Sequence, residues 1–173
     1  PLTQINAGNV GQLEVAWTYR TGAEPPEQGF EATPLMVNNS LYLCTSHNIV
    51  IALDPETGKQ RWWYDPKVDA PPSGVCRGVS YYEVANAQGP CAKRIIFATT
   101  DARLMAVDAN TGQLCASFGS QGTVYLKKGM GEVAKGYYYV SSAPTIVNGN
   151  VVLGGWVLDG QYVGEPSGVV RAF

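Results

Sequence analysis

Residues 52–62 read Ala-Leu-Asp-Pro-Glu-Thr-Gly-Lys-Gln-Arg-Trp, and residues 106–116 read Ala-Val-Asp-Ala-Asn-Thr-Gly-Gln-Leu-Cys-Ala. Both stretches follow the pattern A-x-D-x-x-T-G-[KQ]. A third copy begins at residues 172–173, and the end of another copy (Trp-Thr-Tyr-Arg, residues 17–20) matches residues 62–65. Spacings of about 45 to 66 residues suit a repeat that forms one four-stranded sheet per copy, as in the blades of a β-propeller.

The repeat predicts a specific turn between two strands. Asp54 and Asp108 end a strand, and their short carboxylates can accept hydrogen bonds from the amides of the turn. The glycine of each Thr-Gly pair is free to take a positive φ. Trp62 then falls on the outer strand, where a large flat side chain can cover the seam between neighbouring blades. The second copy has Ala116 at this position, so its seam must be closed differently.

The strand pattern predicts an all-β chain of about two and a half four-stranded antiparallel blades, with no convincing helix. We expect residues 1–173 to form a partial propeller domain, and residues 13–19 to be a closing strand of the ring. The expected blades are 31–65 (strands 31–37, 41–46, 49–54 and 59–65), 77–118 (strands 77–84, 94–100, 103–108 and 113–118) and an incomplete 140–173 (strands 140–147, 150–156 and 168–173).

Composition narrows the class of protein. Charged residues make up 15% of the 173, against a typical ~25%. A net charge of −2 gives no basic footprint for nucleic acid. The chain has no run of 18 apolar residues, so nothing in it predicts a membrane span. Because it starts at a proline and ends inside a repeat, we expect it to be a piece of a longer protein.

The four cysteines show neither a CxxC pair nor zinc-ligand spacing, and the chain has one histidine, which argues against a Cys/His metal site. They are therefore buried thiols or, in an oxidising compartment, disulfides. In an antiparallel blade the start of the second strand lies near the start of the fourth. This predicts a disulfide between Cys91 and Cys115, while the pairing of Cys44 and Cys76 stays open.

The connections are unequal on the two faces of the expected propeller. The long ones (21–30, 66–76, 119–139 and 157–167) all fall on one face, and such a face usually carries the binding site. Glu31, Arg77 and Ser141 start the innermost strands of the three blades on that face, and His47 lies in a short loop there. An arginine beside Glu and Ser suits an anionic, planar, carbonyl-bearing ligand. The alternatives are a structural Glu31–Arg77 ion pair and a histidine that is only a turn residue.

At this point the sequence resembles a known family, the PQQ-dependent quinoprotein dehydrogenases, which are eight-bladed propellers. The docking repeat is similar to theirs. Five stretches resemble the membrane-bound glucose dehydrogenase branch of the family. They are residues 1–7 (Pro-Leu-Thr-Gln-Ile-Asn-Ala), 31–34 (Glu-Ala-Thr-Pro), 41–47 (Leu-Tyr-Leu-Cys-Thr-Ser-His), 76–81 (Cys-Arg-Gly-Val-Ser-Tyr) and 167–171 (Ser-Gly-Val-Val-Arg). The chain lacks the adjacent cysteine pair of the alcohol-oxidising relatives, which favours the sugar-oxidising branch.

The resemblance implies oxidation of D-glucose to gluconolactone with PQQ as cofactor, Ca²⁺ or Mg²⁺ beside it, and ubiquinone as electron acceptor. It implies a periplasmic location at the bacterial inner membrane, with the base, the metal ligands and the membrane anchor outside this chain. Glu31, His47, Arg77 and Ser141 would bind PQQ, with His47 also catalytic. The rivals are a quinate, polyol or alcohol dehydrogenase of the same family, and a non-enzymatic propeller scaffold of the outer-membrane assembly type.

Overall fold

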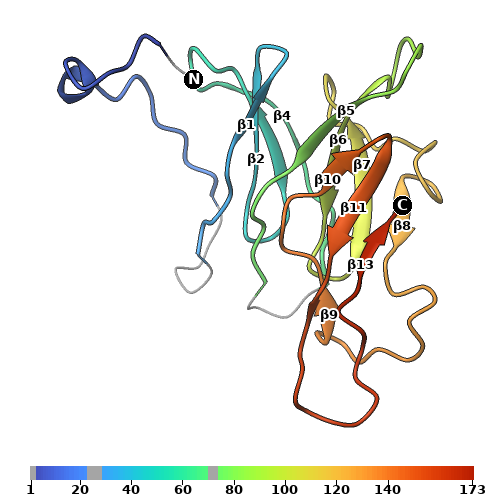
Figure 1. The fold of residues 1–173 in the computed structure, drawn as a ribbon. Helices are drawn as coiled ribbons and strands as arrows, with labels where there is room; N and C mark the ends of the chain where they lie inside the picture. The colour runs from blue at the N-terminus through green and yellow to red at the C-terminus, as the bar shows by residue number, and fades with distance from the viewer. Residues whose placement is uncertain (1–2, 23–28, 70–73) are drawn as a thin grey trace.

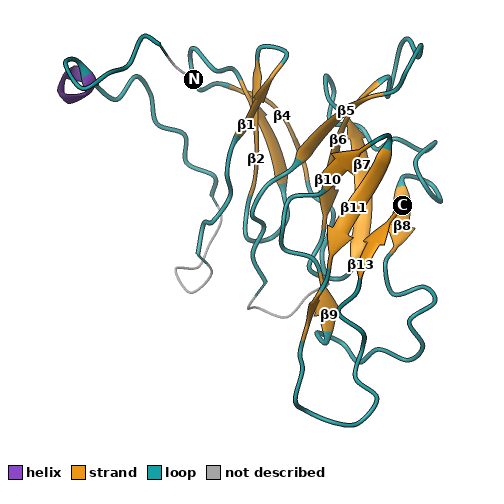
Figure 2. Ribbon diagram, viewed as in Figure 1, coloured by secondary structure: helices purple, strands orange, loops and turns teal. Residues whose placement is uncertain are grey.

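The computed structural model describes residues 3–22, 29–69 and 74–173, and it is built almost entirely from β-strands (Figures 1 and 2). Its one helical element is a single 3₁₀ turn, η1 (Val10–Gln12). Two antiparallel sheets have four strands each, in the orders β1-β2-β3-β4 and β5-β6-β7-β8. Their strands are β1 (Leu35–Val37), β2 (Ser40–Cys44), β3 (Val50–Leu53), β4 (Gln60–Tyr64), β5 (Ser80–Glu83), β6 (Lys93–Ala98), β7 (Arg103–Asp108) and β8 (Thr123–Tyr125). These sheets are the first two blades of a partial β-propeller.

The third blade is incomplete among the described residues. Strands β10 (Thr145–Val147), β11 (Asn150–Gly154) and β13 (Val170–Ala172) form a three-stranded sheet. A short ladder pairs β9 (Tyr138–Tyr139) with β12 (Trp156–Val157). In Figure 1 the β1–β2 and β5–β6 connections lie at the top of the view, and the connection from β12 to β13 lies at the bottom. The three blades thus stand side by side, with different connections at their two ends.

The two copies of the repeat form the same turn, as the sequence predicts. In the first, one carboxylate oxygen of Asp54 accepts hydrogen bonds from the amide and hydroxyl of Thr57, both at 2.9 Å. In the second, Asp108 accepts from the amide of Thr111 at 2.9 Å. The glycine that follows has a φ of +69° in the first copy and +72° in the second. The side chain of Asp thus fixes the turn, and glycine supplies the left-handed backbone that closes it.

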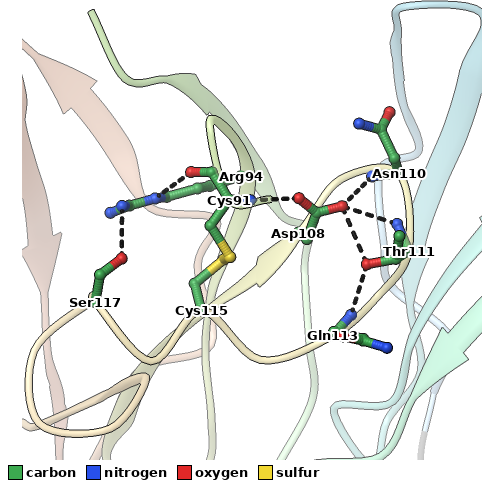
Figure 3. The surroundings of a disulfide bond; sticks show 8 residues. All are labelled: Cys91, Arg94, Asp108, Asn110, Thr111, Gln113, Cys115 and Ser117. Carbon is green, nitrogen blue, oxygen red and sulfur yellow. Dashed lines mark hydrogen bonds between the residues drawn. A yellow bond between two sulfur atoms is a disulfide. The ribbon is translucent and has the colours of Figure 1, made fainter. Parts of the chain in front are cut away.

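The second turn is also tied to a disulfide (Figure 3). Cys91 and Cys115 are bonded, with Cα atoms 5.6 Å apart, which confirms the predicted pair. The other carboxylate oxygen of Asp108 accepts a hydrogen bond from the amide of Cys91 at 2.5 Å. Burial raises the pKa of Asp108, but hydrogen bonds from Cys91, Thr111 and Asn110 outweigh it, so the pKa is lowered. This end of the second blade is therefore held both covalently and by a charged cap.

Tryptophans join one blade to the next. The indole Nε1 of Trp62 donates to the carbonyl of Ala109 at 3.0 Å, and its ring lies over Gly112 in the turn of the second blade. A Cβ built on Gly112 would come within 2.6 Å of that ring. Trp17 repeats the contact one blade earlier, donating to the carbonyl of Pro55 at 3.0 Å and covering Gly58. The prediction that Trp62 covers a seam is thus confirmed.

The expected closing strand at residues 13–19 stays a prediction, because the blade that it would join is not among the described residues. The backbone there is extended, but it forms no strand with any described residue. Trp17 and Tyr19 still pack against the first blade, beside Leu43, Ile51 and Leu53. A strand needs a neighbouring backbone for its ladder, and residues 13–19 form no ladder with the described part of the chain. The side chains dock, but the ladder is not formed.

The fourth strand of the second blade also differs from the expected 113–118. Leu114 forms only an isolated bridge with Val107, and the strand β8 follows later, at 123–125. Between them the chain leaves the sheet in an excursion that closes when Ser120 and Thr123 exchange hydrogen bonds. Gly122, with a φ of +86°, lets the chain return, and a Cβ there would meet Leu114. Two separate segments therefore pair with the outer edge of β7: Leu114, through a single bridge, and the strand β8.

The core runs between the blades. One buried cluster joins the first and second blades through residues such as Tyr42, Ile95 and Phe97, and another joins the second and third through Leu104, Tyr138 and others. On the outer side of the second seam, Arg171 donates to the carbonyls of Leu126 and Lys128. These bonds join the third blade to the segment that follows the fourth strand of the second. Nowhere in the described part of the chain does a helix have the length and apolar character that crossing a membrane requires.

Candidate functional site

The chain segments that lead into the three inner strands are bonded to one another. The amide of Thr33 donates to the carbonyl of Arg77 at 2.9 Å, and the amide of Arg77 donates to the carbonyl of Ser141 at 2.8 Å. None of the three residues is inside a strand, because β1, β5 and β10 begin a few residues later. The inner strands are therefore shorter at this end than the sequence predicts. The backbone hydrogen bonds that link Thr33, Arg77 and Ser141 form a band across the three blades.

Three of the four candidate residues meet on this band. The guanidinium of Arg77 donates from Nε to Glu31 Oε2 at 3.0 Å and from Nη1 to Ser141 Oγ at 3.1 Å. The side chains of Arg77 and Glu31 are 53% and 46% exposed. An ion pair this exposed contributes little to stability. We therefore do not regard it as a structural clamp, and its guanidinium remains accessible to a ligand.

His47 lies elsewhere, in the turn between β2 and β3, and its side chain is exposed. The turn is closed by hydrogen bonds from the amide of Thr45 to the carbonyl of Ile49 and from the amide of Asn48 to the carbonyl of Thr45, both at 2.9 Å. The charge of His47 acts on Asp65 at the end of the first blade. Burial raises the pKa of Asp65, but its hydrogen bonds to Lys67, with the charges of Lys67 and His47, lower it overall. That His47 reaches the same ligand as Arg77 stays a prediction.

Two features beside these residues carry no clear signal in the sequence. Cys44, at the end of β2, is bonded to Cys76, the residue before Arg77, with Cα atoms 6.0 Å apart. Asn48 is fully buried, and its side-chain oxygen accepts from the amide and the hydroxyl of Thr100 at 3.0 and 2.9 Å. Both links cross from the first blade to the second. Neither can be found from local patterns, because each joins residues on different sheets.

Aromatic rings flank the band on the third blade. Tyr139 and Trp156 are stacked, with ring centroids 4.6 Å apart. Burial raises the pKa of Tyr139, and the positive charge of Arg77 partly offsets this. Tyr139 is buried and Trp156 is 42% exposed. The site thus combines a cation, a carboxylate and a hydroxyl, with a stacked aromatic pair on the third blade.

The described residues include no group of three or more His, Cys, Asp or Glu side chains that could hold a metal ion. The expectation that any metal ligands lie outside the chain stays a prediction. What the described site offers is a guanidinium with two of its nitrogens engaged by Glu31 and Ser141. Since a guanidinium has five N–H donors in a planar fork, others remain for carboxylates or carbonyls of a ligand.

Comparison with known proteins places the chain in a family. The profile described as "PQQ: Glucose/ethanol/alcohol dehydrogenase, beta-propeller domain" matches residues 1–173. The chain belongs to this family. A non-enzymatic scaffold of the outer-membrane assembly type is therefore the weaker reading of the repeat, and the expected resemblance to quinoprotein dehydrogenases is confirmed.

Individual members of the family are similar over the whole chain. It is 42% identical to the glycerol dehydrogenase large subunit of Gluconobacter oxydans and 41% identical to the quinoprotein glucose dehydrogenase of Escherichia coli. Each alignment covers 100% of this chain, and 25% and 24% of the respective relative. The crystal structure of the quinohemoprotein alcohol dehydrogenase from Comamonas testosteroni superposes with a TM-score of 0.71 at 31% identity, covering 89% of this chain and 21% of that one. The chain thus spans about a quarter of the length of these relatives.

Proposed function

We propose that the chain contributes three blades and part of the cofactor site to a PQQ-dependent dehydrogenase that oxidises D-glucose to gluconolactone. Family membership supports PQQ as the cofactor. The observation that carries the site is Arg77, which is bonded to Glu31 and to Ser141 from the blades on either side and remains half exposed. A guanidinium with unused N–H donors, beside the hydroxyl of Ser141, suits a planar, anionic quinone.

Each residue has a role that follows from its chemistry. When bound, PQQ supplies the oxidising centre, which takes two electrons as hydride from the alcohol carbon of the substrate. Arg77 would pair with the negatively charged groups of PQQ, while Ser141 and Glu31 would hold the guanidinium in place. His47 is a further candidate for cofactor binding and catalysis, since backbone hydrogen bonds close its turn and the residue is exposed. The proton of the substrate hydroxyl passes to a base that we expect outside this chain.

The remaining partners are part of the same proposal. The resemblance to membrane-bound glucose dehydrogenases supports Ca²⁺ or Mg²⁺ beside the cofactor and ubiquinone as the electron acceptor. It also supports the periplasmic face of the bacterial inner membrane. Two disulfides within one chain agree with an oxidising compartment, because the cytosol keeps most thiols reduced.

A polyol such as glycerol is the second candidate substrate. The observation that favours it is the relative from Gluconobacter oxydans, a glycerol dehydrogenase large subunit that is as similar to this chain as the glucose dehydrogenase is. The residues bonded around Arg77 would serve either substrate, because we propose that they contact the cofactor, which is the same for both, and not the substrate. The choice therefore depends on measured rates.

The test is reconstitution of the complete enzyme that contains this chain. Cofactor-free protein is incubated with PQQ and Ca²⁺ or Mg²⁺, and reduction of an artificial dye is followed with D-glucose, glycerol or quinate. We expect activity only when PQQ is present, with the highest kcat/KM for D-glucose. A higher kcat/KM for glycerol or quinate would replace the substrate assignment. PQQ-independent activity, or none with any of the three, would contradict the proposal.

A further inference from the structure

The disulfide Cys44–Cys76 sits at the point where the two blades present their candidate site residues. Cys44 ends β2 and is followed directly by the turn that carries His47, while Cys76 directly precedes Arg77. Both cysteines are buried, at 0% and 3% exposure, in the cluster between the first and second blades. The bond therefore connects the backbones of two candidate residues through a few covalent links.

The segment that it anchors has little other regular structure. Residues 74–79 form no strand, because β5 begins at Ser80. Their backbone is held by the two cross-blade hydrogen bonds of Arg77. On the other side, Asn48 ties the His47 turn to the second blade through Thr100. Gly78 and Val79 of this segment are buried, but a segment outside any sheet ladder has few backbone hydrogen bonds to keep it ordered, so a covalent link adds to its restraint.

From this arrangement we infer that Cys44–Cys76 is a positioning disulfide: it holds Arg77 and the His47 turn in place so that the cofactor binds to an ordered site. The inference rests on the proposed cofactor role of Arg77. Without the bond the segment 74–79 becomes more mobile, and the side chain of Arg77 must be ordered when PQQ binds. Ordering one mobile side chain weakens affinity about 2- to 12-fold.

The second disulfide provides a matched control. Cys91–Cys115 closes a loop of similar length, with a sequence separation of 24 against 32 for Cys44–Cys76. Chain entropy depends only weakly on loop length, so removing either bond should destabilise the fold by a similar amount. Cys91–Cys115 lies beside the Asp108 turn (Figure 3). The antiparallel ladder of β5, β6 and β7 places this turn at the opposite end of the blade from Arg77. It should therefore leave the cofactor site ordered.

The experiment compares Cys44→Ala/Cys76→Ala with Cys91→Ala/Cys115→Ala in the complete enzyme. Cys44→Val/Cys76→Ala is a second version that refills the core if the first folds poorly. Amide hydrogen exchange is measured for residues 45–49 and 74–79 without cofactor. PQQ binding is measured by titration of the quenching of protein fluorescence. We expect faster exchange and a half-saturating PQQ concentration raised about 2- to 12-fold for the Cys44 variants alone.

Each other outcome overturns the inference in a distinguishable way. Unchanged exchange at 74–79 would show that the bond restrains nothing, whatever the binding result. Equal effects of the two pairs would show a general loss of stability. If binding is unchanged in the Cys44 variants but weakened by Arg77→Ala, the positioning role fails and the proposed cofactor site stands. If neither change alters binding, the site assignment itself fails, and the inference with it.

Discussion

Replacing Gly112 by alanine tests the contact that joins the first two blades. The residue has a φ of +72°, and left-handed backbone costs an L-residue with a Cβ about 1–2 kcal/mol. The new Cβ would also lie 2.6 Å from the ring of Trp62, which is 8% exposed and cannot move freely. Overpacking of this kind costs a further ~1–3 kcal/mol. We therefore expect Gly112→Ala to lower the free energy of unfolding by about 2–5 kcal/mol.

Gly129→Ala separates the two contributions. Gly129 has a φ of +80°, but a Cβ there would meet nothing within 4 Å. It should cost only the backbone strain, about 1–2 kcal/mol. Urea unfolding of the complete enzyme, followed by fluorescence, gives both values. In a Trp62→Ala background the cost of Gly112→Ala should fall to that of Gly129→Ala, since the clash is gone. Equal costs of the two glycine variants in the wild-type background would refute the docking contact.

Two further predictions concern single polar groups. Asn48→Ala should lower the free energy of unfolding, measured by urea titration, by about 1–3 kcal/mol, because the buried amide of Thr100 loses its acceptor. Thr100→Val keeps that amide bonded to Asn48 and should lower the free energy of unfolding by less. The hydrogen bond from Arg61, with others from the turn, lowers the pKa of Asp54 to about 2. Its stabilising effect is therefore complete above pH ~4 and is lost as the pH falls toward 2. Melting temperatures at pH 5, 3 and 2 should show a smaller acid-induced drop for Asp54→Asn than for the wild type, and equal drops would contradict the assignment.

The sequence predicts the features that depend on local chemistry. The Asp-x-x-Thr-Gly turn follows from side chains within four residues, so both copies form as expected. The packing of Trp62 against the next blade follows from the repeat. The disulfide Cys91–Cys115 follows from strand order within one blade. The meeting of Arg77 with its two partners also follows from strand order, since each lies in the segment that leads into the inner strand of a successive blade. The functional role of that cluster remains a prediction.

Features that depend on packing between sheets were not predictable. The extended pattern at residues 13–19 is compatible with a strand, but a ladder needs a partner that local pattern cannot supply. The excursion before β8 arises because glycines allow the chain to leave the edge of β7 and return. The bond between Cys44 and Cys76 joins two blades, so strand order within one blade does not predict it. Asn48 is a single polar residue in a turn, and its burial against Thr100 appears only in three dimensions.

The central claim is that Arg77 binds the cofactor, and equilibrium binding of PQQ to the complete, cofactor-free enzyme tests it most directly. Arg61→Ala is the matched control, because Arg61 also pairs with a carboxylate, at 2.7 Å, but in the turn at the opposite end of its blade. We expect Arg77→Ala to weaken PQQ binding by about 1.5–3 kcal/mol, or roughly 12- to 160-fold, the scale of a hydrogen bond to a charged group. Arg61→Ala should leave binding unchanged. The same dissociation constant for Arg77→Ala and the wild type would contradict the account.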